Sequence, residues 1–342
     1  MNVSSRYLGL DLKSPLVASA SPLSRSLDVA KRLEDAGAAA LVMHSLFQEE
    51  AVAESLELDH YLNYFTEAFA EALTWYPDLP NYRLIPDRYL EQLRLLKQNL
   101  SIPVIGSLNG VSTGGWTSYA RQMEQAGADA LELNLYHIPD MNVCGAEVER
   151  RSVEVLGAVK AEVSIPVAVK LSPFYSSFGA MAQRLAAAGA DALVMFNRFY
   201  QPDLDLDELK VQPRLELSTS GDLLLALRWV AMLHGRVNAQ MAVTGGVHTH
   251  EDVIKAIMAG ADVAMMTSEL LAKGEARLTE IERDLREWME RRGYESVGEM
   301  RGTLSQRKVE DPSAFERANY VRVLQSWRPD PAGQLFREML NS

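Results

Sequence analysis

Two short apolar segments late in the chain each end in small residues suited to binding an anion. Residues 242–247 read Ala-Val-Thr-Gly-Gly-Val, and residues 263–268 read Val-Ala-Met-Met-Thr-Ser. A helix is expected between them, beginning at Thr249. Glycine lets the backbone approach a ligand closely, and free N–H groups at such turns bind phosphate. We therefore predict a phosphate site made of Gly245, Gly246, Thr267 and Ser268.

Other apolar segments also end in polar residues. These are Ser19 and Ser21, on either side of Ala20, then His44, Ser45, Ser107, Asn109, Asn134, His137, Lys170, Asn197 and Arg198. Such residues can simply cap helices. As a set they offer many hydrogen-bonding groups and few carboxylates, which suits a large polar cofactor better than metal-assisted hydrolysis. We expect no metal site, because His248 and His250 flank a helix start and have no third ligand at a matching spacing.

The elements that must position these groups follow one repeated pattern. Runs of the type Ala-Gly-Ala end a helix and lead into a short apolar strand, at residues 36–43, 126–133 and 188–195. We expect eight strands, near residues 16–20, 39–43, 103–108, 130–135, 166–171, 191–196, 239–244 and 262–266. Strands that alternate with helices indicate parallel crossovers, so the fold class is α/β, a single (β/α)8 TIM barrel. An open doubly wound sheet is the alternative.

The chain is expected to form one domain over residues 1–342. Two parts fall outside the repeat: an insertion after strand 2 at residues 46–100, and a C-terminal helical extension at 275–342. We expect a helix over 49–72 and a turn at 79–82 in the insertion, which would serve as a lid or as a packing or dimer contact. The extension should open with an amphipathic helix, 277–292, ended by Gly293.

Composition limits the function classes. A net charge of −12 and a pI near 5.1 argue against nucleic acid or an anionic membrane as the main partner. The sequence has no signal-peptide pattern and no long apolar run. With one cysteine, Cys144, it can form no intrachain disulfide. We expect a cytoplasmic homodimer that acts on a small-molecule substrate.

At these residues the sequence resembles the dihydroorotate dehydrogenase family of flavin enzymes. The resemblance covers nearly the whole chain. It rests on residues 18–21 (Ala-Ser-Ala-Ser), 132–135 (Glu-Leu-Asn-Leu), 169–173 (Val-Lys-Leu-Ser-Pro), 196–197 (Phe-Asn), 244–247 (Thr-Gly-Gly-Val) and 293–297 (Gly-Tyr-Glu-Ser-Val). Each piece alone is weak, and together they are fairly specific.

The resemblance implies a site for flavin mononucleotide (FMN). Gly245, Gly246, Thr267 and Ser268 would hold its phosphate, and Ser19 and Ala20 would line the flavin. Lys170 would place a cation near the ring, although an ion pair at the barrel mouth is its structural alternative. The remaining ring or substrate contacts would come from Asn109, Asn134 and Asn197, which could instead be turn or cap residues.

The sequence also departs from the family pattern. The family's short nucleophilic base is replaced in the loop after Asn134, where His137 takes its position and Cys144 is the alternative. His44 stands where the family has a lysine, and residues 218–221 replace a glycine-rich turn. Thr267 replaces a glycine. No asparagine-rich substrate loop is found after strand 2.

Three hypotheses follow. The first is an FMN-dependent dehydrogenase that oxidises dihydroorotate to orotate, or acts on a related planar ring compound. The second is a barrel isomerase or synthase that binds a phosphorylated substrate directly. The third is a catalytically impaired relative, suggested by the altered base loop. A flavin spectrum and substrate turnover would separate them.

Overall fold

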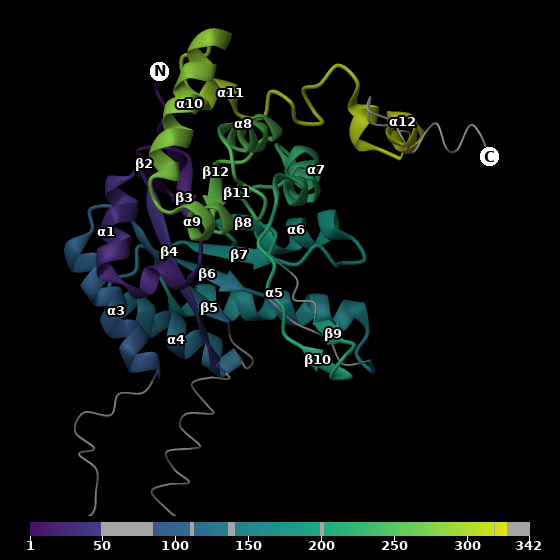
Figure 1. Ribbon diagram of the computed structural model, residues 1–342. Coiled ribbons are helices and arrows are strands. Elements are labelled where there is room, and N and C mark those ends of the chain that lie inside the picture. Colours follow the sequence, from purple (N-terminus) through teal and green to yellow (C-terminus); the bar gives the residue numbers. More distant parts are fainter. Residues whose placement is uncertain (49–84, 110–112, 136–140, 199–201, 318, 327–342) are drawn as a thin grey trace, which may run out of the picture.

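The computed structural model describes residues 1–48, 85–109, 113–135, 141–198, 202–317 and 319–326. Eight parallel strands close into a barrel, with β11 and β12 completing the ring between β8 and β3 (Figure 1). The barrel strands are β3 (Leu16–Ala18), β4 (Ala40–Phe47), β5 (Val104–Asn109), β6 (Ala130–Asn134), β7 (Val167–Leu171), β8 (Ala192–Met195), β11 (Gln240–Thr244) and β12 (Val263–Met266).

Helices follow the strands and cover the outside of the barrel (Figure 1). They are α1 (Leu27–Asp35), α3 (Ile85–Asn99), α4 (Thr113–Gln125), α5 (Gly145–Glu162), α6 (Phe178–Ala187), α7 (Leu223–Leu233), α8 (His250–Ala259), α9 (Ser268–Lys273) and α10 (Arg277–Arg292). Helix α10 packs on α8. The apolar faces of the helices and the outward side chains of the strands form the larger buried cluster.

The barrel interior is a second, smaller buried cluster built from small and β-branched side chains, among them Val17, Ala130, Ala168 and Val194. The antiparallel hairpin of β1 (Ser5–Tyr7) and β2 (Leu10–Leu12) adds Tyr7, Leu8 and Leu12 to this cluster. Because alternate residues of a strand share a face, the residues two and four positions after these small ones also point inward. That periodicity places polar side chains in the barrel toward its carboxyl end.

A Gly-Ala-Asp sequence at residues 127–129, 189–191 and 260–262 links three of the helices to the strands that follow them. Gly127 ends the turn after α4 with a φ of +98°, which glycine adopts without strain. Asp129 then accepts the backbone N–H of Val104 at 2.7 Å and pairs with Lys97 at 2.6 Å. Asp191 makes the equivalent contacts with Val167 and Lys160. The aspartates therefore fix the amino ends of neighbouring strands to one another.

The expected eight-strand barrel is confirmed, and the open sheet is wrong. The strand positions agree to within a few residues, except that β4 continues to Phe47, with a register shift between Val42 and Ser45. Of the range 46–100, residues 85–99 form α3, the helix that joins β4 to β5. The expected helix at 49–72 and turn at 79–82 lie outside the described residues.

The C-terminal range 275–342 begins with the expected helix. Helix α10 spans Arg277–Arg292 and ends at Gly293, whose φ of +74° is left-handed. The chain continues through α11 (Val297–Met300), a 3-10 turn η4 (Pro312–Phe315) and α12 (Asn319–Ser326). Asn2 forms a parallel bridge with Ser296, so the first residues are tied to this region. Among the described helices, none combines the length and apolarity needed to span a bilayer.

Candidate active site

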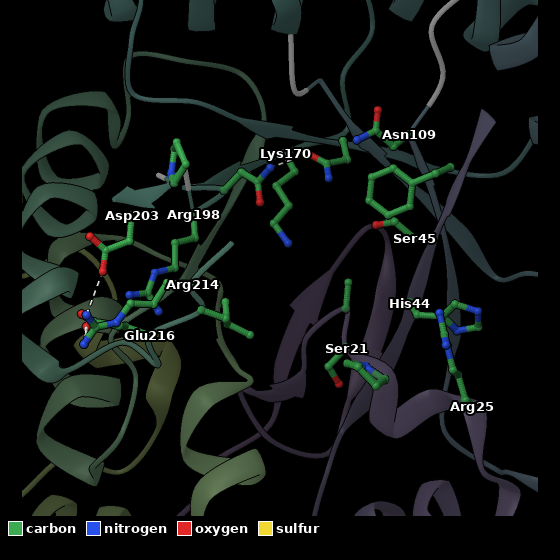
Figure 2. Close-up of a pocket in the computed structure, with 17 residues that line it drawn as sticks. Ser21, Arg25, His44, Ser45, Asn109, Lys170, Arg198, Asp203, Arg214 and Glu216 are labelled. Carbon is green, nitrogen blue, oxygen red and sulfur yellow. Dashed lines mark hydrogen bonds and ion pairs between the residues drawn. The ribbon is translucent and has the colours of Figure 1, made fainter. Parts of the chain in front are cut away.

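A cavity of about 670 Å³ opens at the carboxyl ends of the barrel strands, and this volume lies within the range of small-molecule sites (Figure 2). Side chains from six consecutive strands, β3 to β8, or from the segments directly after them line it. They are joined by residues around the β9–β10 hairpin (Asp203–Asp205 and Lys210–Gln212). The polar and charged lining residues are Ser21, Arg25, His44, Ser45, Asn109, Asn134, Lys170, Asn197, Arg198, Asp203, Arg214 and Glu216.

Five of the ten predicted cofactor contacts line this one cavity: Ala20, Asn109, Asn134, Lys170 and Asn197. The other five, Ser19, Gly245, Gly246, Thr267 and Ser268, do not line it. The amide of Asn197 donates to Asn134 Oδ1 at 2.9 Å, which orients both side chains. Ser19 is buried at the end of β3, and its hydroxyl lies 3.2 Å from that of Thr244 on β11. The barrel therefore brings together groups that lie far apart in sequence.

Lys170 enters the cavity from β7 and is nearly buried. Its Nζ lies 3.4 Å from Oε1 of Glu132, which projects inward from the adjacent strand β6. The other oxygen, Oε2, is buried and has no hydrogen-bond partner among the described residues. Because the pair is long and Lys170 lines the cavity, its ammonium group remains available to a ligand there. The ion pair expected as the structural alternative is thus present, alongside exposure to the cavity.

A second polar group, the serine–histidine cluster, lies over β11 and β12. It comprises Ser218, Gly246, His248, Ser268 and Glu269. The Ser218 hydroxyl is 3.1 Å from His248 Nε2, accepts the N–H of Gly246 at 3.1 Å, and donates to the Ser268 hydroxyl at 2.9 Å. Three groups, two from the turn after β11 and one from the start of α9, therefore converge on one oxygen.

Glu269 holds His248 in this cluster from the opposite side. Its Oε2 lies 3.0 Å from His248 Nδ1, while Oε1 accepts from Lys273 and Arg277. Burial raises the pKa of Glu269, but the hydrogen bonds from these three side chains lower it by more than burial raises it. The pKa of Glu269 therefore lies below its usual value. The carboxylate is therefore ionised, and the imidazole is fixed with Nε2 toward Ser218.

The two glycines after β11 differ in their surroundings. Gly246 has a φ of +86°, and a Cβ there would lie 2.4 Å from the backbone nitrogen of Leu223. Gly245 has a φ of +80°, and a Cβ there would meet no atom within 4 Å. Thr267 precedes α9, and its side chain makes no capping hydrogen bond. The turn thus leaves open space at Gly245, on the side of the barrel where the hydroxyl-bearing residues Thr267 and Ser268 follow β12.

Comparison with known proteins identifies the family. A family model described as dihydroorotate dehydrogenase matches residues 85–289, more than half of the chain. The chain belongs to the dihydroorotate dehydrogenase family. Among its relatives are two proteins named dihydroorotate dehydrogenase B (NAD(+)), catalytic subunit. The one from Thermoplasma volcanium is 28% identical over 90% of this chain and 99% of that protein. The one from Thermoplasma acidophilum is 27% identical over 88% and 98%.

Membership in the dihydroorotate dehydrogenase family settles the reaction class. The protein is a dihydroorotate dehydrogenase-like oxidoreductase, and the family is generally FMN-dependent. The resemblance predicted from the sequence is confirmed, as is the flavin-dependent dehydrogenase hypothesis. The alternative of an unrelated barrel isomerase or synthase is therefore set aside.

At the position of the family's lysine, His44 adds no positive charge. Its ring packs edge-on against Tyr89, with centroids 5.0 Å apart, and its Nδ1 lies 3.1 Å from the Ser24 hydroxyl. Burial, with a contribution from the nearby charge of Arg25, lowers the pKa of His44 to about 4. The imidazole is therefore neutral near pH 7, unlike a lysine in that place.

The cavity also contains charged residues to which the sequence argument gave no role. Arg214 pairs with Asp203 and with Glu216, both at 2.8 Å. Arg25, at the end of the 3-10 turn η1 (Pro22–Arg25), and Arg198 have no carboxylate within ion-pair distance among the described residues. Arg198 is among the strand-end residues predicted from the sequence, without an assigned role, whereas Arg25 was not predicted. The place of Arg25 in the short turn after β3 is the signal that could have marked it.

Of the two candidates for the catalytic base, Cys144 lies within the described residues. His137 lies outside the described residues. Cys144, the alternative, is exposed at the start of α5 and is not among the residues that line the cavity. His248 and His250 take separate partners, since His250 lies 3.8 Å from Asp284 and His248 is held by Glu269. In the part of the chain that the structure describes, no three potential ligands group as a metal site.

Proposed function

We propose that this protein binds FMN at the mouth of its barrel and oxidises dihydroorotate to orotate, or a related planar ring compound to its unsaturated product. The single observation that carries this proposal is the placement of Lys170, Asn134 and Asn197 in one cavity beside the glycine turn of β11. A cavity lined by a fixed cation and amides suits a flat, polar ring, while the turn suits a phosphate.

The donor set over β11 and β12 fits the phosphate of FMN. Backbone N–H groups at Gly245 and Gly246 and hydroxyls at Thr267 and Ser268 would hold it. The Gly246 N–H, which donates to Ser218 in the structure, would exchange that acceptor for the phosphate. Ser218 belongs to the segment that replaces the family's glycine-rich turn. Its hydroxyl donates to Ser268 and accepts from Gly246, so it would hold two of the phosphate-binding residues in place, which a glycine there could not do with a side chain.

The cavity over β3 to β8 would hold the flavin ring and the substrate. Ser19 and Ala20 would line the ring at the end of β3, and Asn109, Asn134 and Asn197 would hydrogen-bond its edge or the substrate. Bound FMN supplies the acceptor for the hydride. Lys170 presents a positive charge where negative charge accumulates on the ligand, and its partial burial strengthens that interaction because little water screens it.

Removing a hydride from a saturated ring also requires loss of a proton from the neighbouring carbon. We assign that step to His137, which follows Asn134 by three residues on the loop after β6. Histidine is a competent base near neutral pH because its ordinary pKa lies close to the working pH. The assignment rests on position in the sequence.

The experiment begins with the purified protein. We expect a flavin absorption spectrum, and mass spectrometry of the released ligand should identify FMN. Dihydroorotate should then bleach that absorption without oxygen and support turnover with an artificial electron acceptor. Absence of flavin after reconstitution with excess FMN would overturn the proposal. Bound FMN without reduction by dihydroorotate would point to another ring compound or to a catalytically impaired relative.

We further propose that the protein acts as a homodimer in the cytoplasm, on small molecules rather than on nucleic acid or membranes. The net charge of −12 supports the absence of polyanionic partners, since it would repel them. The exposed free thiol of Cys144 suits a reducing compartment. Analytical ultracentrifugation of the purified protein tests the dimer, and a sedimenting monomer would reject it.

A further inference from the structure

One buried carboxylate lies inside the barrel below the cavity, and it has no part in the chemistry assigned so far. Glu132 stands between Ala130 and Asn134 on β6, and since alternate residues of a strand share a face, all three side chains point into the barrel. Ala130 belongs to the apolar interior and Asn134 lines the cavity, so Glu132 occupies the layer between them. Its side chain is 1% exposed.

Glu132 has few partners for a buried charge. Lys170 Nζ lies 3.4 Å from Oε1, longer than the usual charged hydrogen bond of about 2.8 Å, and Oε2 has no hydrogen-bond partner among the described residues. Ser107 on β5 is the register neighbour of Glu132, but its hydroxyl bonds the hydroxyl of Ser45. Within the described ranges, Lys170 is therefore the cation that offsets this carboxylate.

The negative charge of Glu132 reaches other groups inside the barrel. Burial raises the pKa of Tyr7, and the charge of Glu132 raises it further. The same carboxylate adds to the rise that burial gives the pKa of Tyr89. Tyr7 comes from the β1–β2 hairpin and Tyr89 from α3, so the field acts on two different sides. A buried charge is weakly screened, and it must act in the same way on a ligand beside Lys170.

The proposed reaction places new negative charge in that field. A hydride consists of two electrons and one proton, so a ring that accepts one gains a single negative charge. Lys170 points into the cavity and attracts this charge (Figure 2). Glu132 pairs in register with Ala168, two residues before Lys170 on β7, so the carboxylate lies behind the ammonium group and repels the same charge.

We propose that Glu132 sets the reduction potential of the bound flavin by opposing the positive charge of Lys170. This inference rests on the proposed function, because it requires FMN beside Lys170. The pair is neutral as a whole, so the carboxylate weakens binding of the reduced cofactor relative to the oxidised one. A reduced ring held by an unopposed cation would pass its electrons less readily to the next acceptor.

The ratio of the dissociation constants for oxidised and reduced FMN tests this inference. Glu132→Gln keeps the shape of the side chain and removes its charge. We expect reduced FMN to gain about tenfold or more in affinity relative to oxidised FMN, because one weakly screened repulsion is lost. A tenfold change in this ratio raises a two-electron midpoint potential by about 30 mV. Equilibration with a redox dye without oxygen measures the potential, and fluorescence titration measures binding of oxidised FMN.

Two control variants separate the charge of Glu132 from other effects. Tyr7→Phe removes a buried hydroxyl that has no hydrogen-bond partner among the described residues, in the same interior. Glu162→Gln removes a carboxylate that pairs with Arg121 on the surface. Both should leave the ratio within about twofold of the wild type, since one carries no charge and the other is screened by water. A ratio unchanged by Glu132→Gln would overturn the inference, as would an equal shift in either control.

Glu132→Asp decides the question if Glu132→Gln does not fold, because it retains a carboxylate to offset Lys170. The shorter side chain draws the charge back toward β6 and away from the cavity. Reduced FMN should then gain about two- to threefold in relative affinity, less than with glutamine. If reduced FMN instead binds less tightly in either variant, Glu132 serves to hold Lys170 in place, and the inference is wrong.

FMN uptake by the wild-type protein separates this inference from the proposed function. A wild-type protein that takes up no FMN would reject both. A wild-type protein that binds FMN and is reduced by dihydroorotate, but whose flavin potential does not respond to the charge at Glu132, would reject the inference alone.

Discussion

The serine–histidine cluster over β11 and β12 and the cavity over β3 to β8 share one rim but satisfy their polar groups in different ways. In the cluster, Ser218, His248 and Glu269 bind one another, and Gly246 has no space for a side chain. In the cavity, Arg25 and Arg198 have no carboxylate within ion-pair distance among the residues that the structure describes. A site whose groups bind each other is ordered before its ligand arrives, whereas one with unpaired charge selects its ligand by charge.

This difference also separates what the family shares from what this chain changes. The cluster keeps the glycine turn after β11 that the family resemblance predicts, with hydroxyls and an imidazole added. The cavity keeps Lys170 and the asparagines but has a neutral His44 in place of the family's lysine, and arginines on two walls. Cofactor binding and substrate choice should therefore respond to different substitutions.

The largest effect is expected at the base. His137→Ala should slow reduction of the bound flavin by substrate by about 100- to 10,000-fold, because general-base catalysis contributes that much. The flavin spectrum should remain, since the change leaves the cluster intact. Stopped-flow absorbance without oxygen measures the rate.

Cys144→Ala is the control for this variant, and it should change little because Cys144 is exposed at the start of α5. A loss of reduction in the cysteine variant alone would assign the base to the thiol. If neither variant slows reduction, the reaction uses no base from this loop.

Lys170 tests whether its role is structural or functional. Lys170→Met would leave the buried Glu132 without its partner, and unpaired buried charges cost about 3–5 kcal/mol. Lys170→Met with Glu132→Gln should recover most of that stability in thermal or urea unfolding, because the amide carries no charge.

Reduction of the flavin should stay slow in the double variant, while the affinity for FMN changes less. That combination would establish a role toward the ligand beyond the ion pair with Glu132. Normal reduction kinetics in the stable double variant would make Lys170 a structural residue only.

The fold was predictable because the signals that set it are local. Gly127 and Asp129 act within a few residues of the strand that they introduce, and the same is true of Gly189 and Asp191. The alternation of strands and helices then leaves few topologies to choose from. The exception was residues 85–99, which were merged with the preceding segment although Pro86, the second residue of α3, is a signal for the start of a helix.

The site was predictable only in part. Residues at strand ends could be found from the sequence, because the carboxyl ends of barrel strands meet at one rim. The sequence could not show which of these residues face each other. The contact between Ser218 and His248 joins residues 30 positions apart, and it depends on how two loops pack. Likewise, the sequence could not show that Asp203 and Glu216 both pair with Arg214, because that depends on where the chain around β9 and β10 lies.

The rigidity of the cluster can be tested at its two glycines. Gly246→Ala forces a Cβ against the backbone of Leu223 at a positive φ, and we expect a loss of about 3 kcal/mol in unfolding free energy together with weaker FMN binding. Gly245→Ala meets no atom, so only the backbone strain of about 1–2 kcal/mol should remain.

Flavin fluorescence titration and thermal unfolding measure the two quantities. Equal effects of the two alanine substitutions would mean that the close approach to Leu223 does not constrain the turn, and that the cluster is no more rigid than the cavity.

The smallest effect concerns the source of the cavity's charge. Burial and Arg25 hold the pKa of His44 at about 4, below its ordinary value of 6.5. Between these values the unfolded chain binds a proton at His44 that the folded protein does not. Stability must therefore rise with pH across this window and be lost as the pH falls from about 6.5 toward 4. His234, whose pKa burial also lowers, adds to the same slope.

His44→Gln should make the slope of unfolding free energy against pH shallower between pH 4 and 6.5, as measured by urea unfolding at a series of pH values. The double variant His44→Gln with His234→Gln should flatten the slope further.

Binding of an anionic ring acid should not strengthen through protonation of His44 between pH 8 and pH 5, because His44 stays neutral there and the arginines stay charged. A slope unchanged by His44→Gln would show that the imidazole is protonated in the folded protein. The cavity would then carry a third, pH-dependent cation on the wall that Arg25 occupies, and the contrast between a fixed positive charge and a neutral histidine would be lost.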